Sequence, residues 1–426
     1  MSQKPGLKRE LGLFEVTLSG VGIILGAGIY ALIGKAAGLA GNSVWMSFAI
    51  SAVVALFTGL SYSELSSMFP GAGAEHEYIK NAFGKVTAFI IGWLIILSGI
   101  IGASTVALGF GGYFSSLFHT PAIPSAIILI VLLSFVLFLG IKESVFFAIL
   151  FTIIETAGLL FIIVIGVPHL GNVDYFEMPL GVKGLFEASA LVFFAYMGFE
   201  GIVKLSEETK NPEKTIPKSL ILALLISIFL YVLVALASVS VMGWDELATS
   251  EAPLADIAFT ALGPDAFVIL SVIALFATAN TALLMMLASS RITYGMAESS
   301  SLPSILARIH HTRRTPSAAI FIIMLLSLMF VFSGDIGLVA NITNYTLFVT
   351  FIVINATVIT LRYKLPELER PFRVPLNIGK FPVLALFGFV FCLFMLTQLG
   401  MGAILSGIGL TLIGLLFALM YEKYGH

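Results

Sequence analysis

Long stretches without a charged side chain are the feature that most limits what this chain can fold into. Of its 426 residues, 59% are hydrophobic and only 11% are charged, whereas a soluble domain carries about 25% charged residues. A soluble fold of this length would need a charged surface that the chain lacks, so lipid must face most of it. The sequence therefore predicts an all-α, multi-pass membrane protein.

The apolar runs between polar breaks set the predicted number of spans. A helix needs roughly 20 apolar residues to cross the hydrocarbon core, and the sequence predicts twelve such helices. They cover residues 14–36, 43–69, 84–117, 122–140, 145–167, 184–206, 217–242, 264–297, 316–333, 336–361, 382–399 and 401–421. The third and eighth are long, which predicts a strong tilt.

Positive charge predicts the orientation of these spans. In the twelve-span arrangement, 20 of the 22 Lys and Arg residues fall on the side of the two termini, and only Lys35 and Lys183 fall on the other. The opposite connector 243–264 contains four acidic residues and no Lys or Arg. Because positive residues stay cytoplasmic, we expect both termini in the cytoplasm. The membrane expected for this multi-pass protein is the plasma membrane.

Composition also excludes several classes of function. A net charge of −2 leaves no basic surface for nucleic acid, and the single Cys392 allows neither an internal disulfide nor a cysteine metal cluster. The six histidines fall in connectors or at the terminus, and no nucleophile with its base is visible. We therefore expect neither enzyme activity nor a cofactor.

Glycine gathers near the middle of the first span, in the sequence Gly26-Ala27-Gly28. Each glycine weakens a helix by about 1 kcal/mol relative to alanine. One interpretation is close helix packing, since Gly22 and Gly26 form a small-xxx-small pair. The other is an unwound segment, which is tolerated at this depth only where the backbone lines a cavity enclosed by protein.

The sixth span has a second candidate break between Phe193 and Gly201, where glycines, aromatic residues and Glu200 lie together. Each candidate break is in the first of five successive spans, and since five is odd, a second five-span unit would be inverted relative to the first. Paired breaks of this kind are the best sequence pointer to a transporter binding site. The predicted organisation is a cytoplasmic segment 1–13, a first five-helix repeat 14–168, an inverted second repeat 184–362, and two additional helices in 381–421.

Backbone dipoles at the two breaks suit an α-amino acid. The outer half of the first span begins near Ala27, where free N–H groups carry partial positive charge and suit a carboxylate. The inner half ends near Ile24, and the half-helix of the sixth span ends between Phe194 and Met197. Both ends leave carbonyl oxygens without a helical partner, and these acceptors suit an ammonium group.

Short motifs are spread over nearly the whole chain: Leu7-Lys-Arg-Glu-Leu-Gly12, Gly26-Ala-Gly28-Ile, Tyr62-Ser-Glu64, Gly92-Trp93, Phe193 to Glu200, Glu207-Glu-x-x-Asn211-Pro212 and Arg370-Pro-Phe-Arg-Val-Pro375. Each is weak alone. In this order and spacing they resemble the amino acid–polyamine–organocation family, in particular its cationic-amino-acid-transporter-like prokaryotic members.

The resemblance implies the leucine-transporter-type fold, with two inverted five-helix repeats plus two C-terminal helices, and secondary transport by alternating access. In that family, amides of the glycine-rich segment bind the substrate carboxylate and carbonyls of both breaks bind the amine. The substrate-binding residues so implied are Ile24, Gly26, Ala27, Gly28, Phe194, Ala195 and Met197. Phe194 matches the aromatic residue that caps the substrate from outside.

The sequence departs from the family in the fifth span, where Glu155 takes the position of a lysine found in many proton-coupled or sodium-independent relatives. Carboxylates at membrane depth are costly and are functional candidates by default. We predict that Glu155 carries a coupled proton, because apolar surroundings disfavour its charged form. The alternative is a permanently neutral acid, bonded to Asn280 or to a backbone carbonyl. Asn280 and Thr281 also lie at about the depth at which sodium-coupled relatives place hydroxyl ligands.

The remaining candidate glutamates are assigned to gating or structure. Glu200 is expected to hold the second unwound segment together, and Glu64 is expected to have a gating or packing role. Glu207 and Glu208 are candidates for a cytoplasmic gate, closed by salt bridges to Arg9 or Arg291. The alternative for this pair is a plain helix end before an Asn-Pro turn.

The sequence therefore predicts a secondary active amino acid transporter that is coupled to protons. Phe194 and Met197 suggest an apolar pocket and favour neutral amino acids. The alternatives are a sodium-coupled or uncoupled amino acid or polyamine exchanger, or a membrane amino acid receptor that does not translocate. Such a receptor would normally carry a signalling domain, which we do not expect beyond Tyr421. No accessory subunit is indicated, so the expected partners are the substrate and the lipid bilayer.

Overall fold

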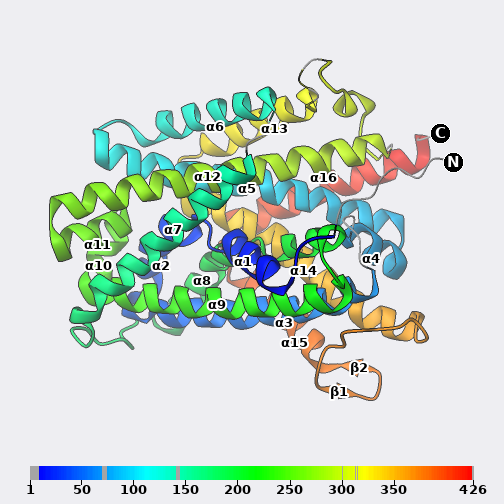
Figure 1. The fold of residues 1–426 in the computed structure, drawn as a ribbon, viewed down its shortest axis with the longest axis horizontal. Helices are drawn as coiled ribbons and strands as arrows, with labels where there is room; N and C mark the ends of the chain where they lie inside the picture. Colours follow the sequence, from blue (N-terminus) through cyan, green and yellow to red (C-terminus); the bar gives the residue numbers. More distant parts are fainter. Residues whose placement is uncertain are drawn as a thin grey trace.

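The computed structural model describes residues 9–69, 74–140, 144–299, 301–311, 313 and 315–424. Its regular structure is almost entirely helical (Figure 1). The α-helices are α1 (Leu13–Ile24), α2 (Gly28–Ala40), α3 (Val44–Met68), α4 (Ala74–Phe83), α5 (Lys85–Phe118), α6 (Ala122–Leu139), α7 (Ser144–Gly166), α8 (Gly181–Val192), α9 (Pro212–Val241), α10 (Trp244–Thr249), α11 (Pro253–Leu262), α12 (Pro264–Glu298), α13 (Ser317–Val331), α14 (Ile336–Lys364), α15 (Val383–Gln398) and α16 (Met401–Tyr424).

Short 3₁₀ helices and one small hairpin complete the fold. The 3₁₀ helices are η1 (Gly41–Ser43), η2 (Val167–His169), η3 (Phe193–Tyr196), η4 (Phe199–Glu208) and η5 (Ser304–Ala307). Strands β1 (Asn377–Ile378) and β2 (Phe381–Pro382) pair antiparallel, with Ile378 opposite Phe381. Neither this hairpin nor the short helices α10 and α11 was predicted from the sequence.

The length and composition of the helices confirm an all-α membrane protein. Within the described residues, nine helical segments are long and apolar enough to cross a bilayer, and α1, α11, α13 and α15 are shorter apolar helices. The count of twelve spans and the inverted repeat stay predictions. The two long spans expected from the sequence are α5, with 34 residues, and α12, with 35.

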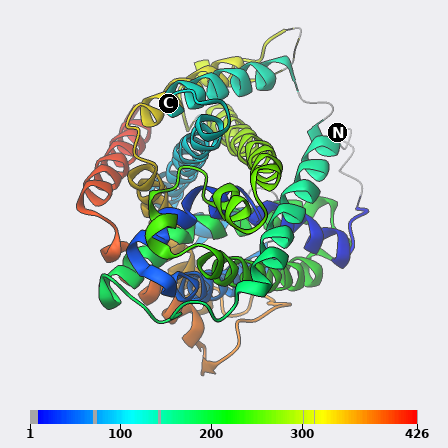
Figure 2. The ribbon, with the colours of Figure 1, turned by 90° about the vertical axis from the view of Figure 1, so that its left-hand side faces the viewer.

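The helices run side by side and divide the molecule into two ends. In Figure 1, α10 and α11 lie at the left-hand end, whereas α4 and the β1–β2 hairpin lie at the right. Figure 2 looks along the bundle and shows many of its helices nearly end-on. Inside it, α5 packs along α12, and α3 packs along α9.

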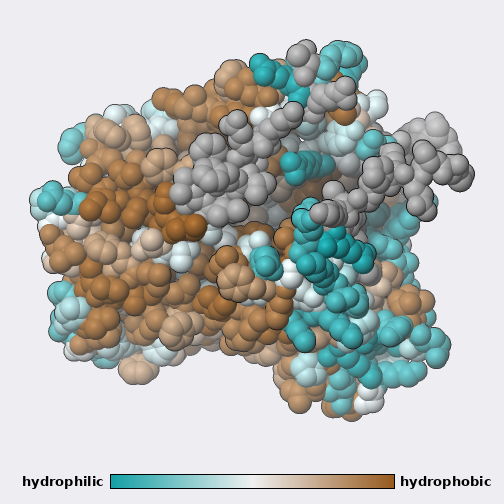
Figure 3. Space-filling model, viewed as in Figure 1, coloured by the Kyte–Doolittle hydropathy of each residue, from teal (hydrophilic) through white to brown (hydrophobic). Residues whose placement is uncertain are grey.

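The outer surface is apolar over the length of the bundle. Figure 3 shows a broad hydrophobic face, with hydrophilic residues gathered mainly toward the right-hand end. Large apolar side chains such as Phe135, Phe229 and Leu416 are about 60% exposed, at 58%, 65% and 61%. A continuous apolar surface of this size is expected where lipid is the solvent.

Candidate functional site

Two interrupted helices meet inside the bundle. Helix α1 ends at Ile24 and α2 begins at Gly28, so the first predicted span is unwound between them. Helix α8 gives way to η3, and η4 follows after a turn at Gly198. The interpretation of both segments as broken helices is therefore confirmed. Close packing is present as well, since a Cβ atom on Gly22 would lie 2.6 Å from the side chain of Thr152.

Glycine is required where the two breaks touch. A Cβ atom on Gly28 would lie 2.6 Å from the Cα atom of Ala195, closer than side-chain carbons approach a backbone. Gly198 has a φ of +113°, and a Cβ atom there would lie 2.9 Å from the carbonyl oxygen of Ile23. Only glycine permits both this conformation and these contacts without strain.

The first turn of α2 offers free backbone donors. Among the residues that the structure describes, no acceptor is found for the N–H groups of Gly28, Ile29 and Tyr30. This is normal for a helix N-terminus, but here the helix end is buried instead of facing water. The positive end of the α2 dipole lies at the same place. The combination suits a carboxylate.

Tyr231, on α9, connects the carbonyl groups of the two breaks. Its hydroxyl lies 2.7 Å from the carbonyl oxygen of Ile24 and 2.9 Å from that of Ala195, and it is the donor to both. A phenol has one proton, so it can bond fully to only one of these oxygens at a time. The oxygen of Ile24 also accepts the N–H of Gly26 at 2.6 Å. The oxygen of Ala195 therefore keeps more acceptor capacity for an ammonium group, and the Gly26 donor predicted for the carboxylate is occupied.

Thr281 of α12 lies against the first break. Its Oγ1 accepts the N–H of Ala27 at 3.1 Å, and its side chain would be 3.3 Å from a Cβ atom on Gly26. The neighbouring Asn280 is 6% exposed. Thr281 thus contacts the predicted carboxylate-binding segment directly, whereas its role as a cation ligand stays a prediction.

Glu155 of α7 is 1% exposed, and its Oε1 has no hydrogen-bond partner among the described residues. The bond to Asn280 or to a backbone carbonyl, which the alternative of a permanently neutral acid requires, is therefore not found for this atom. The backbone oxygen of Glu155 accepts the hydroxyl of Tyr30 at 2.7 Å, which connects α7 to the first turn of α2. Tyr30 and Tyr231 both lie within electrostatic range of the carboxyl group. Glu155 is thus a buried acid beside the broken helices.

Sulfur-containing side chains lie next to the second break. A Cβ atom on Gly102 of α5 would be 3.1 Å from the sulfur of Met285 and 3.6 Å from that of Met197. Phe194 is almost fully buried beside them in η3. Methionine is flexible and polarisable and adapts to apolar partners of different shape. These residues can therefore form an apolar wall for a substrate side chain.

The predicted gating residues make backbone contacts. The Oε2 atom of Glu200 accepts the N–H of Gly198 at 2.9 Å, a bond within the second break. Its expected role in holding that break together stays a prediction. The carbonyl of Glu208 accepts the N–H groups of Glu10 and Leu11, both at 3.0 Å. Among the described side chains, Glu208 forms no ion pair with Arg9 or Arg291. The side chain of Glu207 lies outside the described part of the structure.

Glu64 is the centre of a buried ion cluster. Its carboxylate accepts two bonds from the guanidinium group of Arg362, at 2.9 and 2.5 Å, and one from the N–H of Val374 at 2.8 Å. Arg370 adds a third cationic contact at 3.4 Å. Because these groups come from α3, α14 and the segment before β1, the cluster fixes three parts of the chain together and supports the expected packing role.

Three of these features were missing from the sequence-based prediction. Tyr231 and Met285 come from α9 and α12, which contain no glycine-rich break, so no local signal marked them. Tyr30 follows the first break directly, but nothing in its neighbourhood showed that its hydroxyl bonds to α7. A tyrosine within an apolar span could have been flagged, because its hydroxyl needs a partner when it is buried.

The chain is similar in sequence to known amino acid transporters. The profile of the amino acid permease family matches residues 11–421. The branched-chain amino acid permease BcaP of Bacillus subtilis (strain 168) is 33% identical, over 99% of this chain and 95% of its own length. The methylthioribose transporter of the same organism is 30% identical over the same shares. The vacuolar cationic amino acid transporter 2 of Arabidopsis thaliana is 31% identical, over 86% of this chain and 61% of its own length.

Proposed function

Because the chain belongs to the amino acid permease family and is thus an amino acid–polyamine–organocation transporter, we propose that it carries α-amino acids across the plasma membrane by alternating access. The observation that carries this proposal is the contact between the two broken helices at Gly28 and Ala195. It brings the free donors of α2 within reach of the carbonyl groups of α1 and η3. The substrate carboxylate binds the first set and its ammonium group binds the second.

The preferred substrate is a neutral amino acid with an apolar side chain. Support comes from Met197, Met285 and Phe194, which line the second break without a charged group among them. The branched-chain specificity named for the Bacillus relative points the same way. Two acidic groups lie near the breaks. Glu200 already accepts the N–H of Gly198, and Glu155 is a neutral acid while the site is closed, so neither favours a cationic side chain.

Transport is coupled to protons through Glu155. The unpaired Oε1 atom favours the neutral acid while the site is closed to water, because an unpaired charge is costly in a buried position. Opening the site to water allows the proton to leave. Since Tyr30 connects the backbone of Glu155 to α2, a change at α7 reaches the N–H groups that bind the carboxylate. The sodium-coupled alternative would use Thr281 and Asn280.

Alternating access uses the two breaks as hinges. A broken helix can change direction at its unwound segment without losing the hydrogen bonds of either half, so α1 and η4 can move relative to α2 and α8. These inner halves are already joined, through the backbone bonds from Glu10 and Leu11 to Glu208. The positive connectors, including those that follow α3 and α12, face the cytoplasm together with both termini.

Uptake into liposomes that contain the purified protein tests this function. We expect accumulation of leucine, isoleucine or valine when an inward proton gradient is imposed, and no dependence on a sodium gradient. Isoamylamine and isocaproate, which lack the carboxylate and the amine of leucine, should compete at least tenfold less well than leucine. Methylthioribose should be included as a competitor, because one relative transports it.

The outcomes separate the alternatives. Equal competition by the two analogues would refute the assignment of the breaks as carboxylate and amine sites. Uptake driven by sodium alone would favour Thr281 and Asn280 over Glu155. Saturable binding without uptake under any gradient would support the receptor alternative.

A further inference from the structure

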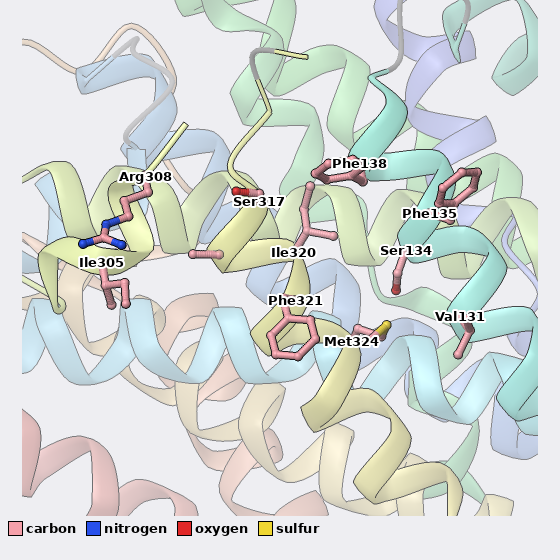
Figure 4. Close-up of a pocket in the computed structure, with 11 residues that line it drawn as sticks. Val131, Ser134, Phe135, Phe138, Ile305, Arg308, Ser317, Ile320, Phe321 and Met324 are labelled. Atoms are coloured by element: carbon pink, nitrogen blue, oxygen red, sulfur yellow. The ribbon is translucent and has the colours of Figure 1, made fainter. Parts of the chain in front are cut away.

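A groove on the outer surface lies between α6 and α13, away from the broken helices. Its volume is about 600 Å³, within the range of sites that bind small molecules. Figure 4 shows the residues around it. Helix α6 contributes Val131, Ser134, Phe135 and Phe138; α13 contributes Ser317, Ala318, Ile320, Phe321 and Met324; and Ile305 and Arg308 come from η5 and the residue that follows it.

The walls of this groove face the hydrocarbon region. Val131 is 44% exposed, and Phe135 and Phe321 are more than half exposed, although all three are apolar. No neighbouring helix covers them within the described residues. In a bilayer such a groove is filled by lipid chains, because water in it would have almost no polar groups to bind.

The end of the groove at η5 carries the positive charge of Arg308. Arg308 is exposed, and no ion pair of Arg308 is found among the described residues. The sequence contains no Asp or Glu between Glu298 and Asp335, nor between residues 119 and 142 of the α6 wall. The guanidinium charge at the mouth of this groove is therefore available to an external anion.

This charged end is held in place by the protein. The hydroxyl of Thr315 donates to the carbonyl oxygen of Phe138 at 3.0 Å, and the rings of Phe138 and His310 meet edge to face at 5.0 Å. Both contacts fix the connector that carries Arg308 to the end of α6. The backbone of the connector that carries Arg308 is thus held beside the groove before any ligand arrives.

We propose that the groove between α6 and α13 is a binding site for one anionic phospholipid. The acyl chains lie against the apolar walls, and the headgroup phosphate pairs with Arg308, which is the geometry of basic pockets between membrane helices. Arginine suits this role because its planar guanidinium binds phosphate oxygens in pairs. The site is separate from the amino acid site, and would make transport depend on the lipid composition of the membrane.

Lipid retention by the purified full-length chain tests this inference. The protein is equilibrated in nanodiscs with equal amounts of phosphatidylglycerol and phosphatidylcholine with identical acyl chains, extracted mildly, and its bound lipids are counted by native mass spectrometry. Wild type should retain phosphatidylglycerol in preference, and Arg308→Gln should lower that preference about fivefold, the effect of one basic residue at a membrane surface. Val131→Trp, which fills the groove, should lower retention of both lipids.

Arg313→Gln is the matched control, because Arg313 is an exposed arginine of the same connector that does not line the groove. It should retain the wild-type preference. If Arg308→Gln and Arg313→Gln lost the preference for phosphatidylglycerol equally, the preference would arise from general surface charge, and the proposal would be overturned. The absence of any preference in wild type would also overturn it, as would occupation of the groove by a single-pass protein helix in place of lipid.

Discussion

Replacement of Gly28 by alanine is the most direct test of the contact between the two breaks. The added Cβ atom would lie 2.6 Å from the Cα atom of Ala195, 3.1 Å from its Cβ and 3.2 Å from its nitrogen. Non-bonded carbon atoms rest about 3.5–4.0 Å apart, so the two segments must separate by about 1 Å. The neighbour that would have to move is backbone, which cannot rotate away as a flexible side chain can.

The expected effect is a loss of substrate binding. Overpacking of this kind costs about 1–3 kcal/mol, which corresponds to a weakening of substrate binding by about 5- to 150-fold. The loss arises because the N–H donors of α2 and the carbonyl acceptors of η3 no longer sit at the separation that an amino acid spans. Equilibrium binding of radiolabelled leucine to the purified protein measures the loss of affinity, and liposome uptake measures the resulting loss of transport.

Gly409→Ala is the control for this prediction. Gly409 lies in α16, and a Cβ atom there would meet nothing within 4 Å. Both substitutions add one methyl group, and both raise the helix propensity of their segment. The difference between them is the contact with Ala195, which arises in Gly28→Ala alone. Binding by Gly28→Ala within twofold of wild type would refute the reasoning, since the two breaks could then separate without effect on the site.

Three further outcomes are expected. Glu155→Gln should abolish uptake driven by a proton gradient while exchange of internal for external substrate continues; unchanged proton-driven uptake would show that another group carries the proton. Tyr231→Phe removes one hydroxyl, worth about 1 kcal/mol, and should change leucine affinity about fivefold; an effect on thermal stability alone would assign Tyr231 a structural role. Glu64→Gln leaves the guanidinium of Arg362 buried without its counter-charge, and should lower the free energy of unfolding by about 3–5 kcal/mol. The control Glu187→Gln breaks the more exposed pair with Lys183 and should change the free energy of unfolding by less than about 1 kcal/mol. Equal melting temperatures of Glu64→Gln and Glu187→Gln in detergent would contradict the packing role of Glu64.

The sequence alone determined that lipid surrounds this protein and where its helices are interrupted. The shortage of charged residues required lipid around the bundle, and the glycines between Gly20 and Gly28 marked the first break to within a few residues. These are local properties, because the composition of about 20 successive residues decides whether they can span a membrane. The helical propensity of a short segment likewise decides whether it can continue as helix.

The limits of that prediction appear at α10, α11 and the hairpin β1–β2. The connector between α9 and α12 was identified as polar and acidic, but not as two helices, because only 6 and 10 residues form them. Helices this short are marginal on their own, and tertiary contacts stabilise them. Leu247 and Leu254 are fully buried, in agreement with stabilisation by packing.

Only the tertiary structure decided which groups surround the breaks. The hydroxyl of Tyr231 meets Ile24, and Thr281 meets Ala27, across 207 and 254 residues of sequence. The sequence around Tyr231 and Thr281 does not predict these partners, since the contacts arise from the packing of α9 and α12 against the unwound segments. Composition and periodicity are properties of one segment at a time, whereas a binding site is made of distances between segments.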